Sequence, residues 1–100
     1  MQHFTALSDP TRQRIVEILT GGPLSAGEIA GQFPLSPQGI SQHLKKLREA
    51  RLVRVRPKAQ QRIYELDPDG ISELSDWIGR IRAFWSVKLD ALEDELAKED

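Results

Sequence analysis

The chain has 100 residues, of which 29% are charged, and it carries a formal net charge of −1 and no cysteine. This length suits one small domain, and the lack of cysteine excludes disulfides and thiolate metal ligands. No apolar run approaches the ~18–20 residues of a membrane span and no signal-peptide pattern opens the chain, so we expect a soluble cytoplasmic protein without a membrane partner.

The charges are sorted along the chain. Residues 41–64 hold eight Lys and Arg against one Glu, a net of +7, whereas residues 65–100 have a net of −7 and residues 1–40 a net of −1. A basic centre in a near-neutral chain predicts one face that binds a polyanion. The acidic C-terminal part should lie away from that face, because it would repel nucleic acid.

Two helices are predicted before residue 21. Phe4 and Leu7 are spaced for one face of a short first helix, which would lie on another element or another subunit. Asp9 followed by Pro10 is a start signal for a second helix, which the Gly-Gly-Pro at 21–23 ends.

A third and a fourth helix follow, separated by a tight turn. Ser25 and Glu28 form a capping box that starts the third helix, and Pro34 ends it. Ser36, followed by a proline, caps the fourth helix. A short helix, a tight turn and a longer helix with a polar face predict a helix-turn-helix over residues 25–50. Three aliphatic residues at helical spacing give the fourth helix a buried ridge: Ile40, Leu44 and Leu47.

The polar face of the fourth helix suits the DNA major groove. Gln38 and Gln42 point away from the ridge, and a Gln side chain contacts adenine with a donor and an acceptor together. Lys45 and Lys46 would neutralise phosphate. His43 lies on the flank, where it either packs against a neighbour or donates to a phosphate or a base edge. An ordinary amphipathic surface helix is the alternative for the whole segment.

Two strand-like segments are predicted within residues 52–66, joined by a five-residue loop. In the first segment Val53 and Val55 alternate with Arg54 and Arg56, so one face is apolar and the other cationic. We interpret this hairpin as a wing beside the fourth helix, with its cations aimed at the DNA backbone. A surface hairpin made soluble by arginine is the alternative.

A last helix is predicted over residues 68–97, and its apolar residues recur at spacings of three and four, close to a coiled-coil seam. At ~1.5 Å per residue it is ~45 Å long, whereas a compact domain of this size has a radius of gyration near ~13 Å. The helix therefore extends beyond its own subunit, and a second copy is the simplest partner for its stripe. The predicted homodimer interface comprises Phe4, Leu7, Ile78, Ile81, Trp85, Leu89, Leu92 and Leu96.

Four segments carry a resemblance to a known family: LSDPTRQRIVEIL, SAGEIAGQF, SPQGISQHLKKLREARLV and RIYEL. Together they resemble the ArsR family of bacterial winged helix-turn-helix repressors. The resemblance implies a mainly α fold of five helices, with a two-stranded β wing between the fourth and fifth and a long C-terminal dimerisation helix. It also implies a homodimer that represses by occupying a pseudo-palindromic double-stranded operator.

The resemblance places DNA contacts on the fourth helix and the wing. With the cations of the basic segment added, the predicted DNA-binding residues are Ser36, Gln38, Ser41, Gln42, His43, Lys45, Lys46, Arg54, Arg56, Lys58 and Arg62. The family usually has Gly at the position of Arg51. A bulky residue there makes a left-handed backbone conformation at the helix end energetically less favourable.

No metal, cofactor or catalytic residue is predicted. Ser25 and Gly27 stand at the family's cysteine metal positions, and the last helix has no histidine, so the chain resembles a metal-independent branch. There is no cysteine nucleophile and no Gly-rich phosphate loop, which argues against an enzyme.

Two further alternatives concern the last helix. Trp77 and Trp85 are interpreted as core or interface residues, but they could instead line a pocket for an apolar effector. The alternative function is a winged-helix protein-interaction module that acts through this apolar helix.

Overall fold

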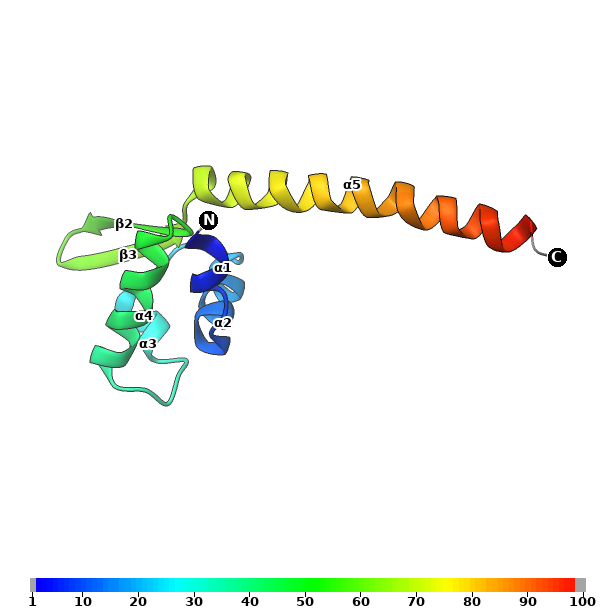
Figure 1. Cartoon of the computed structure of the whole chain (residues 1–100). Helices are drawn as coiled ribbons and strands as arrows, with labels where there is room; N and C mark the ends of the chain where they lie inside the picture. Colours follow the sequence, from blue (N-terminus) through cyan, green and yellow to red (C-terminus); the bar gives the residue numbers. More distant parts are fainter. Residues whose placement is uncertain (1, 99–100) are drawn as a thin grey trace.

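The computed structural model describes residues 2–98. Its elements are α1 (Gln2–Ala6), α2 (Pro10–Leu19), β1 (Leu24–Ser25), α3 (Ala26–Ala30), α4 (Pro37–Glu49), β2 (Val53–Lys58), β3 (Gln61–Leu66) and α5 (Pro68–Lys98). The helices α1 to α4 form a body, the β2–β3 hairpin extends from it beside α4, and α5 leaves it in the other direction as a long rod (Figure 1). This arrangement confirms the predicted mainly α, winged helix-turn-helix fold.

The predicted apolar ridge of α4 lies at the centre of the body. It is covered by aliphatic side chains from α2, α3 and the segment after α4, and removing this apolar surface from water drives their association. The residues of this core that are at most 2% exposed include Ile15, Ile29, Ile40, Leu44, Leu47 and Leu52.

Three predicted helix caps are present. The Asp9 carboxylate accepts from two backbone N–H groups at the start of α2. Ser25 and Glu28 form the expected reciprocal capping box of α3, with bonds of 2.9 and 3.1 Å. Ser36 Oγ accepts from the Gly39 N–H at 3.1 Å, so this exposed serine, also a predicted DNA contact, is the cap of α4.

The predicted two-stranded wing is present as β2 and β3, but the sequence did not predict the third strand of the sheet, whose order within residues 2–98 is β1-β3-β2. The strand β1 pairs antiparallel with β3 through Leu24 opposite Tyr64 and Ser25 opposite Ile63. A two-residue strand is too short to show the alternation by which strands are recognised. Ser25 is also the N-cap of α3, so its sequence context indicated the start of a helix and not a strand.

The hairpin is longer and its turn tighter than expected. The β2–β3 pairing runs from Val53 opposite Leu66 to Lys58 opposite Gln61, so a two-residue turn replaces the expected five-residue loop. Ala59 in this turn has φ 57°. Two-residue hairpin turns require positive φ to match the twist of the strands, even though a non-glycine residue there costs roughly 1–2 kcal/mol.

The end of α4 is a left-handed turn at Arg51, whose φ is 60°. The Arg51 N–H donates to Arg48 O at 2.9 Å and the Leu52 N–H donates to Leu47 O at 3.0 Å, which is the Schellman arrangement. The start of α5 packs on this turn so closely that a Cβ on Gly70 would lie 1.6 Å from the Arg51 carbonyl oxygen. Only glycine at position 70 therefore allows the backbone of α5 to pass this close to the Arg51 carbonyl group.

The helix α5 extends far beyond the body, as predicted. The molecule measures 67 × 27 × 23 Å and has a radius of gyration of 18.5 Å, against about 13 Å for a compact domain of this length. Near the body, the ring of Trp77 meets that of Phe4 edge to face at a centroid distance of 4.8 Å. From Ile78 to Lys98 every residue is exposed. Within residues 2–98, no helix is long and apolar enough to cross a membrane.

Candidate nucleic-acid interface

The buried ridge of α4 fixes which of its side chains face solvent. Gln38, Ser41, Gln42 and Lys45 are all exposed. Gln38, Gln42 and Lys45 lie on the helix opposite Ile40 and its neighbours in the ridge and form the outward face that the sequence predicted, whereas Ser41 lies on its flank.

A hollow of about 480 Å³ separates this face of α4 from β3. It is lined by Ser41, Gln42, Lys45, Arg48, Glu49, Arg62 and Tyr64. The fold thus brings four predicted DNA-binding residues from two elements to one concave surface, which we call the α4–β3 groove. Arg48 was not among the predicted site residues, although its spacing of three from Lys45 puts both cations on one side of the helix.

Arg54 and Arg56 do not lie in the α4–β3 groove. In the register of the hairpin Arg54 is opposite Glu65, whereas Tyr64, which lines the groove, is opposite Val55 and so points to the other face of the sheet. The carboxylate Oε1 of Glu65 lies 3.1 Å from Arg54 Nε and 3.4 Å from Arg56 Nε. The predicted alternation is present, but its cationic face is turned from the groove and is paired within the hairpin.

The remaining predicted cations lie at the edges of the groove or away from it. Lys58 is exposed at the tip of the hairpin. Lys46 lines a different hollow of about 330 Å³, between α1 and α4, together with Thr5 and Arg12. The cations of the basic segment are therefore distributed over more than one face.

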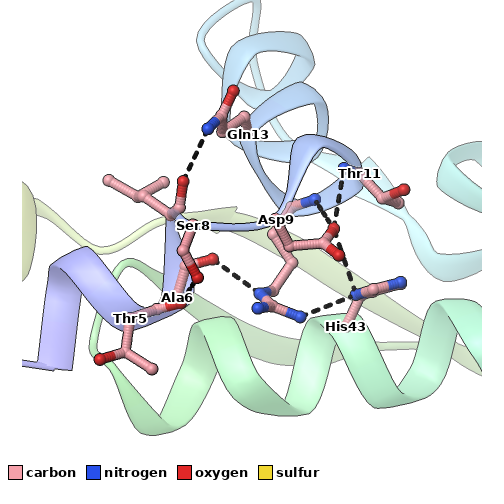
Figure 2. A network of polar contacts seen from close by, with 9 residues as sticks. Thr5, Ala6, Ser8, Asp9, Thr11, Gln13 and His43 are labelled. Atoms are coloured by element: carbon pink, nitrogen blue, oxygen red, sulfur yellow. Dashed lines mark hydrogen bonds and ion pairs between the residues drawn. The ribbon is translucent and has the colours of Figure 1, made fainter.

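His43 is part of a polar network that joins α4 to α2 (Figure 2). Its Nδ1 lies 3.1 Å from Arg12 Nη1 and 3.9 Å from Asp9 Oδ1. An arginine only donates hydrogen bonds, so Nδ1 accepts in this contact and the ring proton is on Nε2. The side chain is 22% exposed. This geometry matches the packing alternative for His43 and leaves the Nε2–H as a donor.

Arg12 is a residue of this network that was not among the predicted site residues. It is only 7% exposed, and its Nε donates to the Ala6 carbonyl at 2.6 Å. Its place in the DPTR segment was the available signal, but helical spacing alone does not distinguish a solvated arginine from a buried one.

The network also perturbs Asp9. The backbone N–H of Arg12 holds the pKa of the Asp9 carboxyl below its ordinary value, and the Thr11 N–H and the Arg12 charge act in the same direction. Hydrogen bonds and positive charges favour the ionised carboxylate, which is the form that caps α2.

The predicted interface residues fall into two groups. Phe4 packs on Trp77 of α5, and Leu7 packs partly buried against the core of its own chain. The others lie on the projecting part of α5 and are 38–55% exposed: Ile78, Ile81, Trp85, Leu89, Leu92 and Leu96.

Across residues 2–98, no three His, Cys, Asp or Glu side chains gather where they could hold a metal ion.

A helix-turn-helix with a polar reading face, flanked by a β hairpin, defines a DNA-binding transcriptional regulator of the winged-helix class. Residues 7–56 match the family model described as "Helix-turn-helix domain". The chain is 48% identical over 86 residues to the HTH-type transcriptional regulator Rv2034 of Mycobacterium tuberculosis, covering 86% of this chain and 78% of that protein. The chain belongs to the ArsR family of transcriptional regulators.

Two further comparisons agree with this assignment. The transcriptional repressor SdpR of Bacillus subtilis is 37% identical over 75 residues, covering 75% of this chain and 83% of that protein. The structure of an ArsR-like transcriptional regulator from Rhodococcus sp. RHA1 superposes with a TM-score of 0.74 at 30% identity, covering 93% of this chain and 88% of that one. These relatives are named as regulators, and this chain is likewise a regulator and not an enzyme.

Proposed function

We propose that this protein is a homodimeric repressor that acts in the cytoplasm, binds a pseudo-palindromic operator and responds to no metal. The observation that carries the proposal is the α4–β3 groove, in which Gln42, Lys45 and Arg62 converge from two elements. Major-groove recognition needs such a combination, because amide side chains read base edges while cations hold the phosphates on either side.

In the proposed complex, α4 lies in the major groove and the hairpin grips the flanking backbone. Gln38 and Gln42 specify bases, and the groove cations Lys45, Arg48 and Arg62 supply affinity that falls steeply with salt. Glu65 is 19% exposed and lies 3.1 and 3.4 Å from Arg54 and Arg56, whereas the pair of Lys45 with Glu49 is longer, at 4.0 Å, and exposed, so we expect Arg54 and Arg56 to contribute less than the groove cations.

The exposed apolar stripe of α5 supports the homodimer. Large apolar side chains in a row on a projecting helix mark an interaction surface. The same row on α5 of a second copy would pack against them, as in a coiled coil. A twofold pair would present two α4 helices to half-sites about 34–36 Å apart. The repressor role is supported by the similarity to SdpR, which is named a transcriptional repressor.

The same stripe favours a second candidate function, a protein-interaction module that acts through α5. The two candidates differ in their response to salt. Binding to duplex DNA should weaken by orders of magnitude between ~50 and ~200 mM salt if several phosphates are contacted, whereas an apolar protein contact should change little.

The deciding experiment is selection of bound fragments from a random duplex pool, followed by sequencing. We expect an enriched motif of two inverted half-sites whose centres are about 10–10.5 base pairs, or a multiple of that, apart. A pool that returns no motif, together with duplex binding that is indifferent to salt, would contradict the repressor and favour the protein-interaction module.

A further inference from the structure

We infer that Arg12 is a positioning residue, which ties the dimerisation helices to the recognition helix α4 and so sets the angle at which α4 meets DNA. This inference rests on the proposed function, because it concerns how a dimer aligns its two reading helices. Arg12 itself lies in the body of the fold and is 7% exposed.

Arg12 makes two contacts that diverge from one guanidinium. Its Nε donates to the carbonyl of Ala6, the last residue of α1, at 2.6 Å. Its Nη1 donates to Nδ1 of His43, in the middle of α4, at 3.1 Å. The guanidinium is a planar, rigid fork, so two contacts made through different nitrogens fix the two helices relative to each other.

The α1 side of this link leads to α5. Phe4 of α1 packs edge to face on Trp77, and His3 Nε2 lies 3.8 Å from Glu73 Oε2. A hydrogen bond of 2.7 Å from Gln13 Nε2 to the Leu7 carbonyl further holds the α1–α2 joint. A displacement of α5 is therefore transmitted to α4 through α1 and Arg12.

The α4 side of the link leads to the reading face. His43 directly follows Gln42 on the helix, and its Nδ1 is held by Arg12 while Asp9 lies 3.9 Å away. Because the contact is made at the middle of α4, it limits rotation of the helix about its own axis. Such a rotation would turn Gln38 and Gln42 away from the base edges.

The first test measures the angle directly, without DNA. The chain has no cysteine, so Ser41→Cys and Val87→Cys introduce two unique sites for spin labels on α4 and α5. The doubly labelled chain is diluted into unlabelled chain of the same sequence, and the distance distribution within one subunit is recorded by pulsed electron paramagnetic resonance. We expect a narrow distribution that broadens or shifts when Arg12→Met is added.

The matched control is Arg14→Met on the same helix. The Arg14 side chain is 61% exposed and, within residues 2–98, pairs only with Glu17 on its own helix, so its loss should leave the distribution unchanged. Equal distributions for the wild-type chain and Arg12→Met would overturn the inference, whether or not the protein binds an operator.

The second test uses the duplex selected by the wild-type protein. Inserting one base pair moves the second half-site by about 3.4 Å along the duplex and rotates it by about a tenth of a turn. We expect this insertion to weaken wild-type and Arg14→Met binding about tenfold or more. For Arg12→Met we expect weaker binding to the selected duplex, little change on random duplex, and a much smaller penalty for the insertion. An unchanged penalty would contradict the role of Arg12.

A pair of His43 variants keeps the test decisive if Arg12→Met fails to fold. Asn offers an acceptor oxygen close to the position of Nδ1 and Leu offers none, while both variants lose the Nε2–H. We expect His43→Asn to keep most of the spacing penalty and His43→Leu to lose it. Equal penalties in the two variants would overturn the inference, and a wild-type protein that selects no motif would instead refute the proposed function.

Discussion

Gln42 and Lys45 show how neighbouring residues on one helix face take different tasks. Both line the α4–β3 groove and both are exposed. An amide side chain matches the donor and acceptor of one base edge, whereas an ammonium group interacts with any phosphate within reach. Their contributions should therefore separate when specific and random duplexes are compared.

We expect Gln42→Ala to relax the preference at one or two base pairs, at a cost of about 1–3 kcal/mol of discrimination. Lys45→Ala should instead weaken all sequences alike and reduce the salt slope by about one. Affinities for the selected duplex, its single-base variants and random duplex at several salt concentrations check both outcomes. Equal losses on every duplex for Gln42→Ala would contradict a base contact.

The lowered pKa of Asp9 predicts how the stability of the fold depends on pH. Because its pKa is lowered in the folded state, mainly by the Arg12 backbone N–H, its contribution to stability is present above its ordinary pKa near 3.8. The contribution is lost as the pH falls through the lower folded value. Asp9→Asn retains a helix cap but carries no charge, so we expect a flatter loss of stability in this acid range.

Denaturant unfolding of the wild-type chain and Asp9→Asn between about pH 5 and pH 2 measures this difference. The matched variant is Glu28→Gln, which alters a second acidic residue that takes part in a helix cap. Hydrogen bonds from the Ser25 backbone and side chain lower the pKa of Glu28, so its loss should flatten the profile in the same direction. Parallel profiles for all three proteins would show that these caps do not titrate as proposed.

Among the elements, the joint between α4 and α5 depends on backbone geometry. Arg51 is in the left-handed region and Gly70 lies against its carbonyl oxygen. The ion pair of Arg51 with Glu73, at 3.1 Å, is exposed and adds little to this joint. The point at which α5 meets the end of α4 is therefore fixed by a contact that only glycine at position 70 permits.

Gly70 and Gly79, both in α5, should respond in opposite directions to the same change. Gly70→Ala places a methyl group 1.6 Å from a backbone oxygen and should destabilise the fold by at least about 1–3 kcal/mol. Among the residues that the structure describes, a methyl group at Gly79 would meet nothing within 4 Å, so Gly79→Ala should stabilise by up to about 1 kcal/mol through helix propensity. Thermal unfolding of both variants checks the signs, and a neutral Gly70→Ala would refute the close contact.

The molecule as a whole is a small body joined to a long helix. The body contains the reading face, whereas the projecting part of α5 carries a row of exposed apolar side chains beside its charged residues. A chain of this shape leaves apolar surface in water unless it associates, and association would also define the distance between two reading faces.

A charge in the apolar seam should separate the proposed dimer. We expect Leu89→Asp to yield a monomer in analytical ultracentrifugation and to lose most of the affinity for the selected duplex, because two linked half-sites bind far more tightly than one. Ala91→Asp is the control, since it adds the same charge on the opposite side of α5. A monomeric Leu89→Asp that bound the selected duplex at full strength would break the link between dimer and operator.

The helices, their caps and the buried ridge of α4 could all be predicted from the sequence. Each of these is local: Ser25 and Glu28 cap a helix three residues apart, and Ile40, Leu44 and Leu47 recur with the helical period. The basic segment and the exposed stripe of α5 could be predicted for the same reason.

Which distant residues meet could be learned only from the folded chain. The pairing of β1 with β3, the burial of Arg12 against His43 and the pairing of Arg54 and Arg56 with Glu65 all join segments that local spacing does not relate. The sequence does not reveal whether a cationic side chain contacts solvent, a carboxylate or an imidazole. Its partner depends on strand register and helix packing, which are set by tertiary structure.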